Sequence, residues 1–175
     1  MRLAIIGLAG LLLLAGCSKP SPGAAGKDAR AASPAASAAA SPPIEGTFYG
    51  NGKPGSLNFV GAYADDPFDG KPVTAVVLSS QDQAGHAKPV FDAVFGKLGD
   101  AIVAKIEPDG SLIGVDVVNS GLQSPSGSIS LSGVVTLKDY HAEGGQISGR
   151  LTTGGDVDVF GQKLQIDVSF RTKAP

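Results

Sequence analysis

The sequence lacks what a disulfide framework or a nucleic-acid surface requires. Its 175 residues contain one Cys and no Trp, and only 6% are aromatic. A single Cys forms no disulfide within the chain, so the folded part depends on its apolar core. Lys and Arg number 14 against 16 Asp and Glu, and no basic block is present that would displace the counterions of a nucleic acid. We therefore expect no nucleic-acid partner.

Glycine and proline, in contrast, are abundant, with 25 and 12 residues respectively. This composition is typical of many short strands joined by turns, and it argues against a helical bundle or a coiled coil.

The only long apolar run stands at the N-terminus. Arg2 precedes the nearly uncharged stretch Leu3–Ala15, which is shorter than the roughly 20 apolar residues of a membrane-spanning helix. A positive residue before a short apolar segment predicts a signal peptide. The end of this segment, Leu14-Ala15-Gly16-Cys17, resembles the lipobox of bacterial lipoproteins.

That resemblance implies cleavage after residue 16 by type II signal peptidase. Cys17 would then carry a diacylglycerol thioether and a further acyl chain such as palmitate. Two or three chains hold a protein on a bilayer, because each buried methylene contributes about 0.8 kcal/mol. Ser18, in place of Asp, implies sorting to the outer membrane, facing the periplasm, with the inner membrane or surface exposure as alternatives. The alternative to lipidation is an ordinary secretory signal in which Cys17 is incidental.

The composition changes abruptly after the cysteine. Residues 18–43 contain ten Ala, five Ser, five Pro and two Gly, and no large apolar residue. Such a segment cannot offset the entropy of ordering, and its prolines interrupt any helix. We therefore expect three parts: a signal peptide over 1–16, a lipidated Cys and disordered tether over 17–43, and a globular domain over 44–175.

The domain of residues 44–175 holds all seven Phe and all three Tyr, with ten Lys and Arg against fifteen Asp and Glu. Apolar residues alternate with polar ones most clearly over 163–171, 128–138 and 146–152, which predicts an antiparallel sheet with one solvated face. Further strands are predicted at 47–49, 57–64, 73–80, 102–106, 113–117 and 157–160. The fold class is thus all-β, an antiparallel sandwich or small barrel of about eight or nine strands.

One stretch has helical spacing instead. Between Pro89 and Gly96, the residues Phe91, Val94 and Phe95 lie three and four positions apart, which predicts a short helix acting as a lid or plug. Alternation places most of the aromatic residues in the core. This set comprises Phe59, Tyr63, Phe91, Phe95, Phe160 and Phe170.

Catalytic and zinc-binding patterns are missing. His86 and His141 both stand in polar segments that read as exposed turns, and neither has a second ligand at zinc spacing. No Ser lies in a Gly-x-Ser-x-Gly elbow. The residues favour a protein that is not an enzyme, and they predict no cofactor.

The remaining candidate site is acidic. Asp65, Asp66 and Asp69 cluster in a predicted loop over 65–70, where their carboxylates would supply hard oxygen ligands for calcium. The spacing does not match an EF-hand, and acidic residues also simply solvate a turn.

The sequence therefore predicts a membrane-anchored envelope lipoprotein whose β domain binds a periplasmic protein or cell-wall component. Its role would be accessory, in assembly, or in inhibition or immunity. One alternative is a lipocalin-like carrier of an apolar ligand, which would need a barrel with the predicted helix across its mouth. The other is a cell-wall hydrolase, which would need two carboxylates in one cleft.

Overall fold

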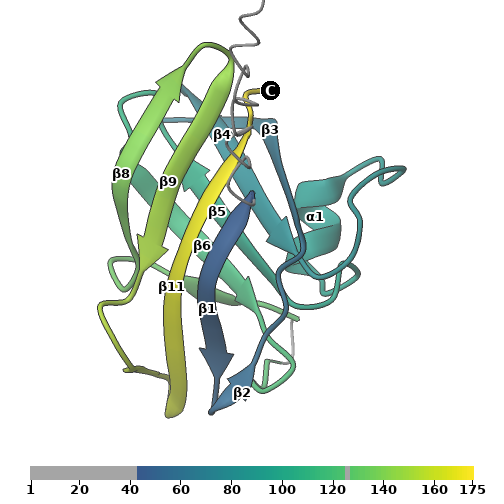
Figure 1. Ribbon diagram of the computed structural model, residues 1–175, viewed down its shortest axis with the longest axis vertical. Helices are drawn as coiled ribbons and strands as arrows, with labels where there is room; N and C mark the ends of the chain where they lie inside the picture. Colours follow the sequence, from purple (N-terminus) through teal and green to yellow (C-terminus); the bar gives the residue numbers. More distant parts are fainter. Residues whose placement is uncertain (1–42, 125–126) are drawn as a thin grey trace, which may run out of the picture. The chain divides into compact units, whose positions relative to one another are not determined.

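A computed structural model describes residues 43–124 and 127–175, so the predicted signal peptide, Cys17 and most of the tether lie outside the described residues. The described part is a sandwich of two antiparallel sheets, with one sheet in front of the other in Figure 1. The all-β prediction is confirmed, and of the two architectures left open the sandwich is the one observed. No helix among these residues has the length and apolar character that crossing a membrane requires.

The two sheets are called sheet A and sheet B here. Sheet A has the order β2 (Lys53–Pro54), β1 (Ile44–Gly50), β11 (Gln162–Lys173), β9 (Gln146–Thr152) and β8 (Thr136–Glu143), with β10 (Val157–Val159) also paired to β11. Sheet B has the order β3 (Phe59–Phe68), β4 (Lys71–Ser79), β5 (Ala101–Ile106), β6 (Leu112–Val118) and β7 (Ile129–Leu131). The strands number eleven in this part of the chain, two more than the nine predicted ranges, because β2 was not predicted and the range 128–138 is divided between β7 and β8.

The main core lies between the sheets and follows from alternation along the strands. On β11, every second residue from Leu164 to Phe170 faces inward and is buried, while the residues between them are more exposed. Leu78 of β4 and Ile102 of β5, both in sheet B, belong to the same buried cluster as these β11 residues. This buried apolar surface provides the main driving force for folding.

A second, smaller core lies on the other face of sheet B. The helix α1 (Pro89–Val94) packs there, and β4 is consequently buried on both of its faces. The buried residues of this cluster are Ala75, Val77, Ala93, Leu98, Ala101 and Val103. The predicted helix is thus present, but it covers the outer face of a sheet and does not act as a lid over a barrel mouth.

The alternating stretch 128–138 is not one strand. Ile129–Leu131 forms β7 in sheet B, and Thr136–Glu143 forms β8 in sheet A. Between them the chain passes from one sheet to the other, with Gly133 at φ +71°. Leu131 and Val135 are both buried in the common core, so alternation continues through the crossing and conceals it.

The predicted acidic loop 65–70 is also mostly strand. Asp65 to Phe68 extend β3, with an irregular register between those two residues, and only Asp69 and Gly70 form the turn to β4. Asp69 has φ +50°, a conformation that Asp tolerates better than most residues.

Candidate functional site

Phenylalanine is the residue type whose placement departs most from expectation. Among the seven, only Phe48 and Phe170 are buried, at 3% exposure each. The expectation of a mostly buried aromatic set is therefore wrong for Phe59, Phe91, Phe95 and Phe160. The exposed side chains are Phe59 at 39%, Phe68 at 55%, Phe91 at 50%, Phe95 at 51% and Phe160 at 83%.

Two of these rings form one wall of an open groove of about 570 Å³. Phe91 and Phe95 lie one turn apart on α1 and just after it, and their ring centroids are 4.4 Å apart. The ammonium of Lys97 lies 5.4 Å from the centre of the Phe91 ring. We call this surface the α1 groove, with Val90 and Val94 completing its apolar wall.

The α1 groove is also lined by charged residues. Asp65 and Asp66 contribute from β3, and Asp65 forms an ion pair with Lys105 of β5 at 2.9 Å. Asp116 of β6 lines the groove as well and accepts a hydrogen bond from the Ser130 hydroxyl of β7. Asp66 is exposed and forms no ion pair within the described part of the chain.

The three residues of the predicted calcium site are therefore only partly brought together. Asp65 and Asp66 line the α1 groove, whereas Asp69 lies in the β3–β4 turn and does not line it. Across residues 43–124 and 127–175, no three His, Cys, Asp or Glu side chains gather as a metal site would require. Calcium binding stays a prediction that the side-chain positions do not favour.

Local hydrogen bonds hold α1 in place. Pro89 starts the helix, and Asp92 accepts hydrogen bonds from Lys97 at 2.8 Å and from the His86 ring at 2.9 Å. These two partners hold the pKa of Asp92 below its ordinary value, chiefly through the bond from Lys97. His86 thus lies in a loop as expected, but His141 lies on β8 and not in a turn. Leu98 is fully buried beneath the helix and joins it to sheet B.

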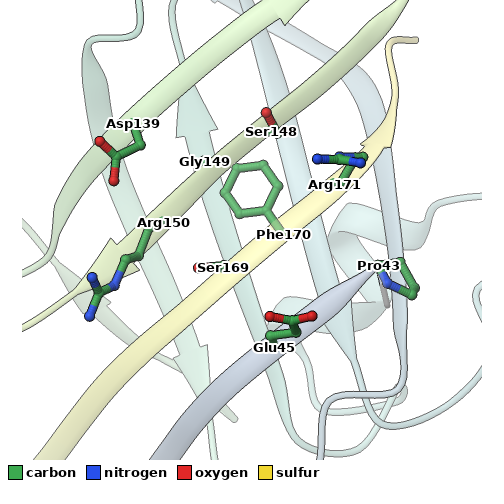
Figure 2. Close-up of a pocket in the computed structure, with 9 residues that line it drawn as sticks. All are labelled: Pro43, Glu45, Asp139, Ser148, Gly149, Arg150, Ser169, Phe170 and Arg171. Atoms are coloured by element: carbon green, nitrogen blue, oxygen red, sulfur yellow. The ribbon is translucent and has the colours of Figure 1, made fainter. Parts of the chain in front are cut away.

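A second hollow, of about 260 Å³, lies on the outer face of sheet A (Figure 2). Its lining includes Ser148, Ser169 and Phe170 together with the charged side chains of Arg150 and Arg171. Asp167 binds Arg150 through two hydrogen bonds of 2.6 Å, which raises the pKa of Arg150. Figure 2 shows the two guanidinium groups on opposite sides of the hollow, so they do not converge on one anion.

The most exposed phenylalanine, Phe160, lies apart from both hollows. It occupies the two-residue turn between β10 and β11, with φ +52°. Beside it, Ile129 and Ser130 of β7 and the amides of Gln123 and Gln162 line a shallow surface. Sequence reasoning missed this feature because Val157 to Phe160 read as one alternating strand.

None of the known protein families, curated proteins or solved structures that were compared matches this chain. The geometry of the described residues is therefore the only guide to what the domain does.

Proposed function

We propose that this protein is an envelope lipoprotein, anchored through Cys17, whose β domain binds a periplasmic protein by means of the α1 groove. The observation that carries the proposal is the pair of half-exposed rings, Phe91 and Phe95, which contact each other and line this groove. Large apolar side chains gathered at a surface mark interaction sites, and aromatic residues are enriched at the centres of protein interfaces.

The sequence of α1 places Phe91 and Phe95 on the exposed side of the helix. Its inward face is supplied by Ala93, which is fully buried, while Phe91 and Phe95 stand on the outward side and contact each other. Covering both rings with a partner would remove substantial apolar area from water, at roughly 25 cal/mol per Å².

The charges around the groove indicate the chemistry of the partner. Asp66 offers a carboxylate without an ion pair among the described residues, and the domain carries fifteen acidic against ten basic side chains. Such a surface favours a partner that places an apolar side chain against Phe91 and Phe95 and a Lys or Arg beside Asp66.

The other functions considered have less support. A carrier of apolar ligands would need an enclosed space, but the region between the sheets is occupied by the packed side chains of the main core. A hydrolase would need two free carboxylates facing one cleft. In the α1 groove Asp65 is paired with Lys105 and Asp116 accepts a hydrogen bond from Ser130, which leaves Asp66 alone without such a partner among the described residues.

The binding proposal is tested with the double substitution F91A/F95A in the full-length chain. A photo-reactive phenylalanine analogue at position 95 would identify the partner in intact cells, and the purified partner would then be titrated. We expect the double substitution to weaken binding by at least about 30-fold, the loss typical of an interface hot spot. Phe59→Ala, which removes an exposed ring outside the α1 groove, is the matched control. Equal affinities for the double variant and the wild type would refute the proposal.

The anchor is tested separately with Cys17→Ser. Because the thioether forms on the sulfur, we expect the variant to lose acylation, type II processing and sedimentation with membranes. Continued membrane sedimentation with cleavage at the same bond would refute the lipoprotein assignment.

A further inference from the structure

Four hairpins in the described part of the chain are closed by two-residue turns in which both residues have positive φ. The first residue has φ +49° at Asn51, +50° at Asp69, +59° at Gly144 and +52° at Phe160, and a glycine with φ between +72° and +77° follows each. Paired positive φ angles define the turn that matches the twist of the flanking strands, for which Asn-Gly, Asp-Gly and Gly-Gly are preferred. Three of these turns follow that preference, and the fourth has Phe.

Phenylalanine is a poor choice at that position. Its Cβ crowds the neighbouring carbonyl when φ is positive, and it has no short polar group to bond the local backbone as Asn and Asp do. Burial of the ring would compensate, but Phe160 is 83% exposed. Within the described domain, Phe160 therefore carries both backbone strain and hydration of an apolar ring without a contact that offsets them.

Strained residues that the fold does not need are found at functional sites. We propose that Phe160 is an anchor that inserts into an apolar pocket of a protein partner. The proposal rests on the proposed binding function and adds to it a second, separately testable contact.

The turn presents the ring from a rigid support. The side chain of Asp158 accepts a hydrogen bond from Gly161 N–H at 2.9 Å and lies 3.5 Å from the ammonium of Lys163. Asn51 of the neighbouring turn accepts a hydrogen bond from Lys163 N–H at 2.8 Å and donates one to the Gly121 carbonyl at 2.9 Å. A turn held in this way loses little further backbone freedom on binding, which favours affinity.

The position of the ring also suits an interface shared with the α1 groove. Ser130 of β7 lines the shallow surface beside Phe160, and its hydroxyl donates a hydrogen bond to Asp116, which lines the α1 groove. One partner can therefore contact both surfaces across β7.

The charges at the turn favour a protein over a bilayer as the occupant. Asp156 and Asp158 precede Phe160, and one cation, Lys163, lies beside Asp158 at 3.5 Å. The turn therefore carries a net negative charge, which the anionic surface of a membrane would repel. The amide of Gln162 donates to the Gln123 carbonyl at 2.9 Å, so the ring is bordered by neutral polar groups, as an interface anchor usually is.

The first test is Phe160→Asn, which gives this turn the Asn-Gly sequence found at Asn51 and Gly52. Relief of the strain should lower the equilibrium constant for unfolding by roughly fivefold to tenfold. Urea unfolding of the full-length chain measures this change. Asp69→Asn in the β3–β4 turn is the matched control, expected to change the constant little. A less stable Phe160→Asn variant would show that the ring supports the fold, and would overturn the proposal.

The second test measures contact. A photo-reactive phenylalanine analogue is placed at position 160 in full-length protein in cells, and at position 144, in the equivalent exposed turn, as the control. We expect a protein cross-link from position 160 alone. The protein so identified, once purified, should bind Phe160→Asn at least about 30-fold more weakly than wild type, while Phe160→Trp retains binding.

Three further outcomes would overturn the proposal. They are the absence of a protein cross-link from position 160, undiminished binding by the more stable Phe160→Asn variant, and Phe160-dependent flotation with vesicles of phosphatidylethanolamine and phosphatidylglycerol. The last result would indicate a membrane contact instead. If F91A/F95A loses binding while Phe160→Asn binds normally, the α1 groove proposal is retained and only the Phe160 proposal is overturned.

Discussion

The side chain of Gln83 forms several hydrogen bonds to residues of sheet B. Its amide nitrogen donates to the Val77 carbonyl at 2.9 Å and to the Ser79 hydroxyl at 2.8 Å, and its oxygen accepts from Tyr63 at 2.9 Å. The residue is only 6% exposed. These hydrogen bonds connect the loop before α1 to β3 and β4. Removing the Gln83 side chain would leave its buried partners without a hydrogen bond, which costs free energy because they are not solvated either.

We therefore expect Gln83→Ala to lower the free energy of unfolding by about 1 to 3 kcal/mol. Urea denaturation measures the change. Gln165→Ala, at a half-buried position on the outer face of sheet A, should alter stability by less than about 0.5 kcal/mol. Similar effects of the two substitutions would contradict the role assigned to Gln83.

Asp92 makes stability depend on pH. Hydrogen bonds from Lys97 and His86 lower its pKa in the folded state relative to the unfolded state. A lowered carboxyl pKa stabilises the fold at neutral pH, and the contribution disappears as pH falls through the folded-state pKa. We expect Asp92→Asn to have a lower urea midpoint than wild type at about pH 7, and the difference should shrink as the pH falls below the ordinary carboxyl pKa of about 4. A constant difference across this range would contradict the assignment.

At single positions the sequence predicted which residues share a face better than it predicted whether that face is buried. Phe170 is buried as its alternation indicated, because β11 has a covered inner face. Phe91 and Phe95 share the spacing of a buried helix face, yet they are exposed because Ala93 takes the place against the sheet. Periodicity states which residues share a face, but not which face the rest of the chain covers.

At the scale of elements, α1 depends on Leu98. The helix spans six residues, too few to be stable alone, and it has no side-chain cap at Lys88. Leu98, fully buried beside Ala93 and Val103, holds it against sheet B.

Leu98→Ala should therefore lower the free energy of unfolding by about 2 to 4 kcal/mol and speed amide exchange in α1. Chemical denaturation and hydrogen exchange measure these effects. Phe91→Ala, in which the replaced ring is half exposed, should reduce stability by less than about 1 kcal/mol. Unchanged exchange in α1 on loss of Leu98 would show that the helix is held by other contacts.

Element prediction succeeded where the turn chemistry was explicit. Between the predicted strands 102–106 and 113–117, Pro108, Asp109 and Gly110 are typical turn residues, and the structure has a β5–β6 hairpin there with Gly110 at φ +88°. The break between β7 and β8 was missed because both strands present their apolar residues to the same core. Which sheet a strand joins depends on contacts distant in sequence, which alternation does not record.

At the scale of the whole molecule, β11 organises sheet A. It pairs with β1 from Gly50 opposite Leu164 to Ile44 opposite Phe170, and with β9 on its other side. Its inward residues Ile166 and Val168 are almost fully buried.

A chain ending before Gln162 should consequently fail to unfold cooperatively and be cut rapidly by proteases, because sheet A loses its central strand. Denaturation curves and limited proteolysis provide the measurement. Removal of Ala174 and Pro175 alone, which forfeits one backbone hydrogen bond from Ala174 to Gly145, should leave a cooperative transition. A cooperative transition in the shorter chain would contradict the central position of β11.

The pairing of β1 with β11 also governs when the domain becomes compact during synthesis. Until residues 162–173 emerge, β1 has only the two residues of β2 beside it in sheet A. Contacts between such distant segments form late and slowly. A ribosome that is still translating this chain therefore holds β1 without its main partner in sheet A until β11 has emerged.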